Sequence, residues 1–319
     1  MISYVQAIVI GLLQGVTELF PVSSLGHSVL VPALLGWHQV VQSQTAQESF
    51  YLAFLVGLHV ATAIALLIFF WAQWARIVSA LLRSLRRRRI DPADPDERLG
   101  WLLVVATIPA ALVGVAFEHA LRTLFAKPLA AAVFLTCNGL ILLAGERLRR
   151  RTPDPQRLAV RLDPERLTSI ARGPRDAVVV PGRAARTRQR GAGELASLAF
   201  GEALLIGASQ ILAFFAGISR SGVTMVAGLG RGLSHEDAAR FAFLLATPII
   251  LAAGVYKLPD LIGPNGNGVR GQILAGSLVA GVAAYLSVRF LTRWFQTRTL
   301  TPFAVYCLVV GTACIIRFA

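Results

Sequence analysis

The chain has 319 residues, of which 55% are apolar and 15% are charged. A soluble domain typically carries about 25% charged residues, so this composition excludes an ordinary soluble protein. Basic residues outnumber acidic ones by 31 to 17, but the arginines gather in short blocks beside long apolar stretches. That placement is typical of the cytoplasmic loops of a membrane protein and argues against a nucleic-acid-binding surface.

Taken in chain order, the apolar stretches predict an all-α polytopic membrane protein. The first, Ile2–Trp37, is broken midway by Pro21–Ser24, and a later one, Leu195–Leu233, is broken by Ala216–Ser221. A polar break at membrane depth predicts a re-entrant helical hairpin, because backbone leaves the helix there only when it is buried in protein or faces water. Six uncharged runs have roughly the length of a bilayer-crossing helix: Leu52–Trp74, Trp101–Phe117, Pro128–Gly145, Phe241–Tyr256, Gly271–Val288 and Leu300–Ile316.

The two hairpins belong to an internal repeat. Gln6–Ser28 and Glu202–Thr224 align without a gap at an offset of 196 residues, and the alignment pairs Gln14 with Gln210. Three predicted spans follow each hairpin, and an odd number of crossings makes consecutive copies insert upside down relative to each other, as an inverted-topology repeat. We therefore expect a first repeat over residues 1–150, an Arg-rich cytoplasmic linker over 151–193 and a second, inverted repeat over 194–319.

The distribution of basic residues predicts the orientation. If each hairpin enters and leaves on one side, one face of the membrane carries 25 Lys or Arg residues and the other carries four. The positive-inside rule makes the richer face cytoplasmic. The first hairpin then opens outward and the second opens inward.

Glu18 is the strongest candidate for a functional residue, because it is a carboxylate deep in an apolar segment. Burying such a group in a membrane costs about 2.5 to 3.5 kcal/mol, so a role is the default interpretation. Gln14 lies one helical turn earlier on the same face. Beyond the break come Ser23, Ser24 and His27, and the imidazole next to Glu18 is a candidate general acid or base.

The second hairpin supplies the opposite charge. Arg220 lies in its break, and a guanidinium offers a rigid fork of donors that suits phosphate oxygens. The neighbouring groups that could add hydrogen bonds to an anion are Ser219, Ser221, Gly222 and Thr224, with Gln210 further back in the hairpin. An alternative is that Arg220 serves as the counter-ion of Glu18. If the halves are inverted, the two breaks meet near mid-bilayer and form a site for a phosphorylated amphiphile.

Two sequence motifs resemble a known family. QGVTELFPVSSLGH (Gln14–His27) and AGISRSGVT (Ala216–Thr224) are similar to the two signatures of bacterial undecaprenyl-diphosphate phosphatases, the bacitracin-resistance proteins. The resemblance implies hydrolysis of undecaprenyl diphosphate to undecaprenyl phosphate and inorganic phosphate, which recycles the lipid carrier of peptidoglycan synthesis. It also implies a divalent cation, magnesium or calcium. By position, Glu18 matches the acidic residue and metal ligand, His27 the catalytic histidine and Arg220 the phosphate-binding arginine.

Two departures from the family pattern stand out. Gln14 occupies a position where many members have a second glutamate, which removes one potential charge from a metal site. Ala216 replaces the usual proline before Gly217, and we expect this change to make the second break less rigid.

Several alternatives remain at this point. The nucleophile could be His27, Ser24 or an activated water, and an inverted repeat with a mid-depth polar site is also the plan of a polyprenyl-phosphate transporter or flippase. The expected partners are undecaprenyl diphosphate and membrane lipids, with a homodimer as one arrangement and no nucleic acid. The expected location is the bacterial plasma (inner) membrane, with the active site on the extracytoplasmic side.

Overall fold

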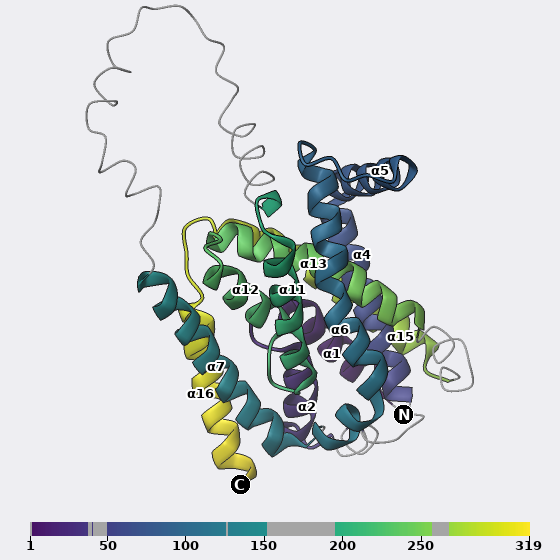
Figure 1. Cartoon of the computed structure of the whole chain (residues 1–319). Helices are drawn as coiled ribbons and strands as arrows, with labels where there is room; N and C mark the ends of the chain where they lie inside the picture. The colour runs from purple at the N-terminus through teal and green to yellow at the C-terminus, as the bar shows by residue number, and fades with distance from the viewer. Residues whose placement is uncertain (1, 38–39, 41–49, 126, 152–194, 257–267) are drawn as a thin grey trace, which may run out of the picture.

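The computed structural model describes residues 2–37, 40, 50–125, 127–151, 195–256 and 268–319 (Figure 1). Within these ranges all regular structure is helical and there is no strand, which confirms the all-α prediction. The elements are α1 (Tyr4–Thr17), α2 (Ser24–Leu34), α4 (Phe50–Phe69), α5 (Trp71–Arg87), α6 (Pro95–Phe125), α7 (Pro128–Arg151), α11 (Phe200–Ser209), the 3-10 helix η1 (Gln210–Phe214), α12 (Arg220–Gly230), α13 (His235–Tyr256), α15 (Arg270–Trp294) and α16 (Thr301–Phe318).

The long helices identify a multi-pass membrane protein. Among the described residues, α6, α7, α13, α15 and α16 are each long and apolar enough to cross a bilayer, and α4 with α5 forms a sixth candidate if that bent pair is one span. Large apolar side chains point outward from these helices, such as Val115, Leu278 and Val309, which are 73%, 64% and 64% exposed. In water such a surface would aggregate, whereas lipid tails solvate it.

The predicted span Leu52–Trp74 is wrong at its second end. Helix α4 stops at Phe69, and the chain bends by 87° into α5, which begins at Trp71. From Trp71 onward the apolar side chains recur on one part of the helix surface and arginines occupy another. A segment of that kind is amphipathic and is stable at a surface rather than inside the bilayer. The length of the apolar run alone did not reveal this change.

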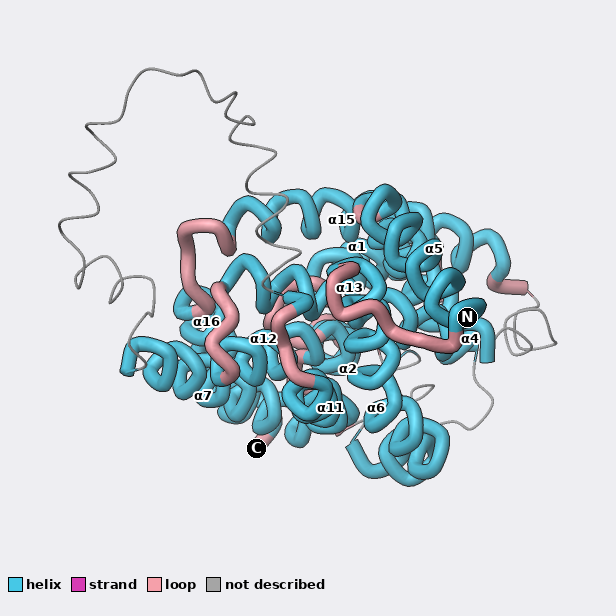
Figure 2. Tube along the Cα trace, turned by 45° about the horizontal axis from the view of Figure 1, so that its top comes forward, coloured by secondary structure: helices cyan, strands magenta, loops and turns pink. Residues whose placement is uncertain are grey.

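The hairpins α1–α2 and α11–α12 lie in the middle of the molecule, between the paired helices α7 and α16 on one side and α4, α6 and α15 on the other (Figures 1 and 2). Helix α1 packs on α15 where Gly11 meets Gly276, and α11 packs on α6 where Gly207 meets Ala106. A methyl group on either Gly11 or Gly207 would overlap a backbone carbonyl of the facing helix. Small residues at these positions allow the close approach of helices that membrane proteins use.

Gly11 and Gly207 are 196 residues apart, so equivalent positions of the sequence repeat each contact a long helix from the other half of the chain. The inverted orientation of the second half and the division into two repeats stay predictions. The predicted linker over residues 151–193 lies outside the described residues, apart from Arg151 at the end of α7.

A buried carboxylate joins three elements at one end of the bundle. Glu146 of α7 is 4% exposed, and its Oε1 accepts hydrogen bonds from Nε2 of His235 at 2.6 Å and from the backbone amide of Leu300 at 2.7 Å. Arg149 donates to Nδ1 of the same imidazole at 2.6 Å. Because the guanidinium cannot accept, Nδ1 is the acceptor and Nε2 carries the proton. The cluster therefore ties the end of α7 to the starts of α13 and α16.

Replacing Glu146 with alanine is expected to lower the free energy of unfolding by about 3 kcal/mol, because the buried amide of Leu300 and the ring of His235 both lose their acceptor. Thermal unfolding of the purified protein in detergent measures this. Asp96→Ala is the matched control, since it breaks an exposed ion pair with Arg76 worth about 1 kcal/mol or less. Equal losses in the two variants would contradict a structural role for the cluster.

Candidate active site between the two hairpins

The first hairpin turns sharply just after Glu18. Helix α1 ends at Thr17 with Glu18 as its C-cap, and α2 begins at Ser24. Ser23 adopts a φ of 73° and caps α2, its Oγ accepting from the amide of Gly26 at 3.2 Å. The turn brings Ser24 back toward the end of α1, where its hydroxyl donates to Oε2 of Glu18 at 2.5 Å.

The second hairpin has a comparable turn before Arg220. The backbone of Gly217 adopts a φ of 117°, a conformation that L side chains rarely adopt. Ser219 then caps α12, its Oγ accepting from the amide of Gly222 at 3.2 Å. Arg220 is thus the first residue of α12, which fixes its backbone at the helix N-terminus.

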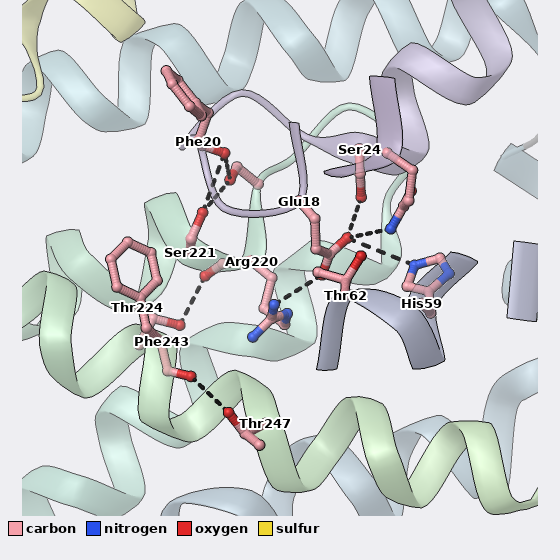
Figure 3. A network of polar contacts seen from close by, with 12 residues as sticks. Glu18, Phe20, Ser24, His59, Thr62, Arg220, Ser221, Thr224, Phe243 and Thr247 are labelled. Atoms are coloured by element: carbon pink, nitrogen blue, oxygen red, sulfur yellow. Dashed lines mark hydrogen bonds and ion pairs between the residues drawn. The ribbon is translucent and has the colours of Figure 1, made fainter. Parts of the chain in front are cut away.

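Hydroxyl groups join the two turns to each other. Ser23 Oγ also accepts from the amide of Gly217 at 3.2 Å. The hydroxyl of Ser221 donates to the carbonyl oxygen of Phe20 at 3.3 Å (Figure 3). The hydroxyl of Ser219 donates to the same oxygen at 3.4 Å. All three serines are 3% exposed or less. Their contacts therefore lie within the protein and hold the hairpins in register, while direct binding of substrate by them stays a prediction.

Asn138 of α7 supports both turns and was missed in the sequence. Its side-chain nitrogen donates to the carbonyl of Pro21 at 2.9 Å, and its oxygen accepts from the amide of Ser219 at 3.0 Å. The side chain is fully buried. An amide inside the otherwise apolar run Pro128–Gly145 was the available signal, because buried amides in membrane helices usually join segments.

Glu18 and Arg220 form the centre of the site. Nη2 of Arg220 donates to Oε1 of Glu18 at 2.8 Å (Figure 3). Nε2 of Gln14 donates to Oε2 of Glu18 at 3.0 Å. Glu18 is 8% exposed, so its charge is neutralised by these donors rather than by bulk water. Nη1 of Arg220 is buried and has no hydrogen-bond partner among the described residues. That nitrogen is a free cationic donor, as binding of an anion requires.

His59 of α4 is a second residue that sequence reasoning missed. Its Nε2 lies 3.6 Å from Oε2 of Glu18 (Figure 3). Its Nδ1 is 2.8 Å from the carbonyl of Leu55. Because a carbonyl only accepts, Nδ1 carries the proton of that bond and Nε2 faces the carboxylate. Thr62 follows one turn later on the same helix and is labelled beside the site in Figure 3. In the sequence, a histidine one turn from a threonine in an apolar run is only a weak indication of a functional site.

His27 lies elsewhere than its sequence neighbours suggested. Its Nδ1 donates to the carbonyl of Ser23 at 2.7 Å, and its Nε2 lies 2.8 Å from the hydroxyl of Tyr306 in α16. The two rings stack with centroids 5.8 Å apart. Among the described residues, neither ring nitrogen has a hydrogen bond to Glu18 or Arg220, so any catalytic role of His27 stays a prediction.

Three further predicted groups make contacts with backbone groups of the protein. The hydroxyl of Thr224 donates to the backbone carbonyl of Arg220 at 2.8 Å, and Gly222 uses its amide in the helix cap. Gln210 is 2% exposed and donates to the carbonyls of Gly207 and Ala106 at 3.3 and 3.5 Å. Gln210 therefore lies where α11 packs on α6, and its role in binding substrate stays a prediction.

The donor set fits a divalent cation only in part. No group of three or more His, Cys, Asp or Glu side chains gathers among the described residues. Glu18 supplies one carboxylate, and both of its oxygens already accept hydrogen bonds. Magnesium is often held by one or two carboxylates together with the phosphates of a substrate. The residues therefore fit a cation that arrives with a diphosphate, with Glu18 as its protein ligand, and they do not form a complete cage.

Comparison with known proteins identifies the family of this chain. The family described as bacitracin resistance protein BacA matches residues 7–313. The chain belongs to the BacA family. Similar proteins include undecaprenyl-diphosphatase 2 of Frankia alni, at 56% identity, and the undecaprenyl-diphosphatases of Mycolicibacterium paratuberculosis and Mycobacterium avium, at 57% and 56%. Each alignment covers 100% of this chain and 98% of the relative. The resemblance expected from the two motifs is confirmed.

Proposed function

We propose that this chain hydrolyses undecaprenyl diphosphate to undecaprenyl phosphate and inorganic phosphate. The observation that carries the proposal is the buried Nη1 of Arg220, which has no hydrogen-bond partner in the described part of the chain. Two hairpins hold it beside Glu18 in the middle of a bundle of membrane-spanning helices. A lipid diphosphate has the apolar chain and the anionic head that such a site accommodates. The names of the full-length BacA relatives support the same reaction.

Positioning and charge stabilisation account for most of the proposed catalysis. Glu18 fixes the guanidinium of Arg220 through Nη2, which leaves Nη1 to bind an oxygen of the transferred phosphoryl group. Preorganised donors in a site that excludes water are worth much more than the same donors in water. Phosphoryl transfer depends mainly on such positioning, because its transition state spreads charge over the equatorial oxygens.

The contact between Ser24 and Glu18 favours Ser24 as the nucleophile. Its hydroxyl already donates to Oε2, so the carboxylate is placed to take the proton as Ser24 Oγ bonds to the terminal phosphorus. The bond from that phosphorus to the bridging oxygen then breaks, and undecaprenyl phosphate leaves. Water would hydrolyse the phosphoserine to release inorganic phosphate. Trapping a phosphoenzyme on Ser24 tests this order, and a label on His27 or on neither residue would contradict it.

A magnesium or calcium ion that arrives with the diphosphate would neutralise further charge on its oxygens, with Glu18 as the protein ligand. We therefore expect a chelator to reduce phosphate release and either cation to restore it. The setting we propose is the bacterial plasma membrane, with the site open to the extracytoplasmic side and the arginine-rich loops in the cytoplasm. There the reaction would recycle the carrier for peptidoglycan synthesis and confer bacitracin resistance.

The test is phosphate release from undecaprenyl diphosphate by the purified protein, with and without magnesium or calcium. Wild type should turn over, whereas Glu18→Gln and Arg220→Ala should lose turnover even when the rate is expressed per folded protein, with the folded fraction measured by thermal unfolding. Arg231→Ala is a matched control, since this arginine is exposed at the far end of α12. Lipid movement across vesicles without phosphate release would instead support the transporter alternative.

Replacing His59 with phenylalanine is expected to lower kcat about tenfold and to change KM little. The carboxylate of Glu18 loses the imidazole whose Nε2 lies 3.6 Å from Oε2, and a tenfold loss of kcat corresponds to about 1.4 kcal/mol of transition-state stabilisation. Steady-state phosphate release measures both constants. His59→Gln keeps a polar group near the position of Nε2 and should retain most of the activity. A phenylalanine variant with wild-type kcat would remove His59 from the site.

A further inference from the structure

Helix α5 lies across the end of the bundle instead of along it (Figure 1). It leaves α4 at an angle of 87°. The 20 residues of α4 are already enough to cross the hydrocarbon core of a bilayer, which takes about 20 residues. A helix at this angle to the end of such a span runs along the membrane surface.

The surface of α5 is divided into three faces. One face is buried: Ile77 and Ala80 are fully covered, and Ser84 accepts a hydrogen bond from the indole nitrogen of Trp101 in α6 at 3.0 Å. A second face carries large apolar side chains, namely Trp71, Val78, Leu82 and Leu85, which are 69%, 46%, 53% and 57% exposed. Intervals of seven, four and three residues place these four on one stripe of the helix.

The third face is basic, and its charges are of two kinds. Arg76 and Arg83 pair with carboxylates of the following turn, Asp96 at 3.0 Å and Asp94 at 2.8 Å. The run Arg86–Arg89 at the end of the helix is exposed and forms no ion pair with any described residue. Four adjacent arginines therefore carry charge that the described part of the protein does not neutralise.

We propose that α5 is an interfacial helix that binds anionic phospholipid. The stripe of Trp71, Val78, Leu82 and Leu85 would insert at the boundary between headgroups and acyl chains, and Arg86–Arg89 would bind headgroup phosphates. An amphipathic helix with Trp and Leu on one face and arginines on another is typical of a helix that lies in this plane. Charge complementarity selects acidic headgroups, because four clustered arginines are attracted to an anionic leaflet within about 10 Å of its surface.

A bilayer is favoured over a protein partner because the exposed stripe is at the end of a membrane span.

Gln73 fixes the orientation of α5 against the bundle. Its Oε1 accepts hydrogen bonds from Nε and Nη2 of Arg240 in α13 at 3.1 and 2.9 Å. The stripe is therefore held at the level where α4 ends. This inference concerns a surface remote from the Glu18–Arg220 site and does not depend on the proposed reaction.

The first experiment tests whether the stripe is in lipid. The protein is reconstituted into vesicles of phosphatidylcholine brominated at shallow acyl positions, and tryptophan quenching is compared between wild type and Trp71→Phe. Trp71 should be quenched by the bromine atoms and shielded from iodide in the buffer, and the variant should lack that component. A Trp71 component that iodide quenches and brominated lipid does not would overturn the proposal.

The second experiment tests the headgroup. Native mass spectrometry counts phosphatidylglycerol molecules retained by protein from mixed vesicles of phosphatidylcholine and phosphatidylglycerol. A variant with glutamine at all four positions of Arg86–Arg89 should retain at least several-fold less phosphatidylglycerol than wild type. The matched control places glutamine at four exposed arginines outside α5, namely Arg231, Arg289, Arg293 and Arg298. Equal losses in both variants would show a general effect of charge and overturn a site on α5.

Discussion

Replacing Arg220 with lysine is expected to lower kcat for phosphate release by about 10²- to 10³-fold, the usual cost of losing one preorganised donor to a transition-state oxygen. The guanidinium can serve two partners at once, because Nη2 binds Glu18 and no group among the described residues occupies Nη1. A lysine ammonium is a single point charge on a flexible stem and cannot hold both positions in a fixed plane. Steady-state kinetics on a long-chain prenyl diphosphate measures the loss.

Two controls separate this effect from a general loss of structure. Arg231→Lys changes an exposed arginine on the same hairpin and should leave kcat unchanged. Glu18→Gln combined with Arg220→Lys should be little worse than the poorer single variant, because residues that act as one unit are strongly non-additive. If Arg220→Lys turned over like wild type, Nη1 would not be the group that binds the transferred phosphate.

The meeting of the two hairpins could be inferred from sequence because each carries an unusual ionisable group. Glu18 and Arg220 are both costly in an apolar segment, and the offset of 196 residues places the two breaks at equivalent points of a repeat. The structure brings these side chains into contact across 202 residues of chain. The contact is compatible with both interpretations of Arg220, since Nη2 pairs with Glu18 and Nη1 has no hydrogen-bond partner within the described ranges.

The partners of the serines could not be predicted from sequence. Ser23, Ser219 and Ser221 were expected to face a substrate, yet each has a partner in the protein. Which group a hydroxyl meets depends on how one turn is placed against the other. That placement comes from close packing of Gly26 against Gly217 and from the bridge made by Asn138, and neither contact has a local sequence signature.

His59 and the bend before α5 were missed for a related reason. Both lie in the run Leu52–Trp74, which contains no charged residue and therefore reads as one uniform span. Hydropathy averaged over such a window measures the transfer of the segment into lipid, and it is insensitive to which face a single imidazole occupies. The contact of His59 with Glu18 depends on how α4 is rotated against α1, which only tertiary packing determines.

Replacing Gly217 with alanine is expected to lower the free energy of unfolding by about 4 kcal/mol, the sum of a strained backbone and an overpacked contact. At a φ of 117° a side chain is strained, and the new methyl group would also overlap the carbonyl oxygen of Ala131 in α7. Relief would require the turn to move off α7, and Ser219 and Arg220 would move with it. Thermal unfolding in detergent measures the loss of stability, and phosphate release from the folded fraction should fall as well.

Two other glycines, at and just after the end of α12, distinguish backbone strain from overpacking as the cause of the loss. Gly232 has a φ of 88° but open space around the position of an added methyl group, so Gly232→Ala should cost about 1 to 2 kcal/mol from backbone strain alone. Gly230 lies in α12 with open space and ordinary backbone, so Gly230→Ala should stabilise the protein by about 0.5 to 1 kcal/mol. If Gly217→Ala cost no more than Gly232→Ala, the packing of the second turn against α7 would not hold Arg220 in place. A loss about 2 to 3 kcal/mol larger than that of Gly232→Ala, together with reduced phosphate release, would indicate that this packing positions the guanidinium opposite Glu18.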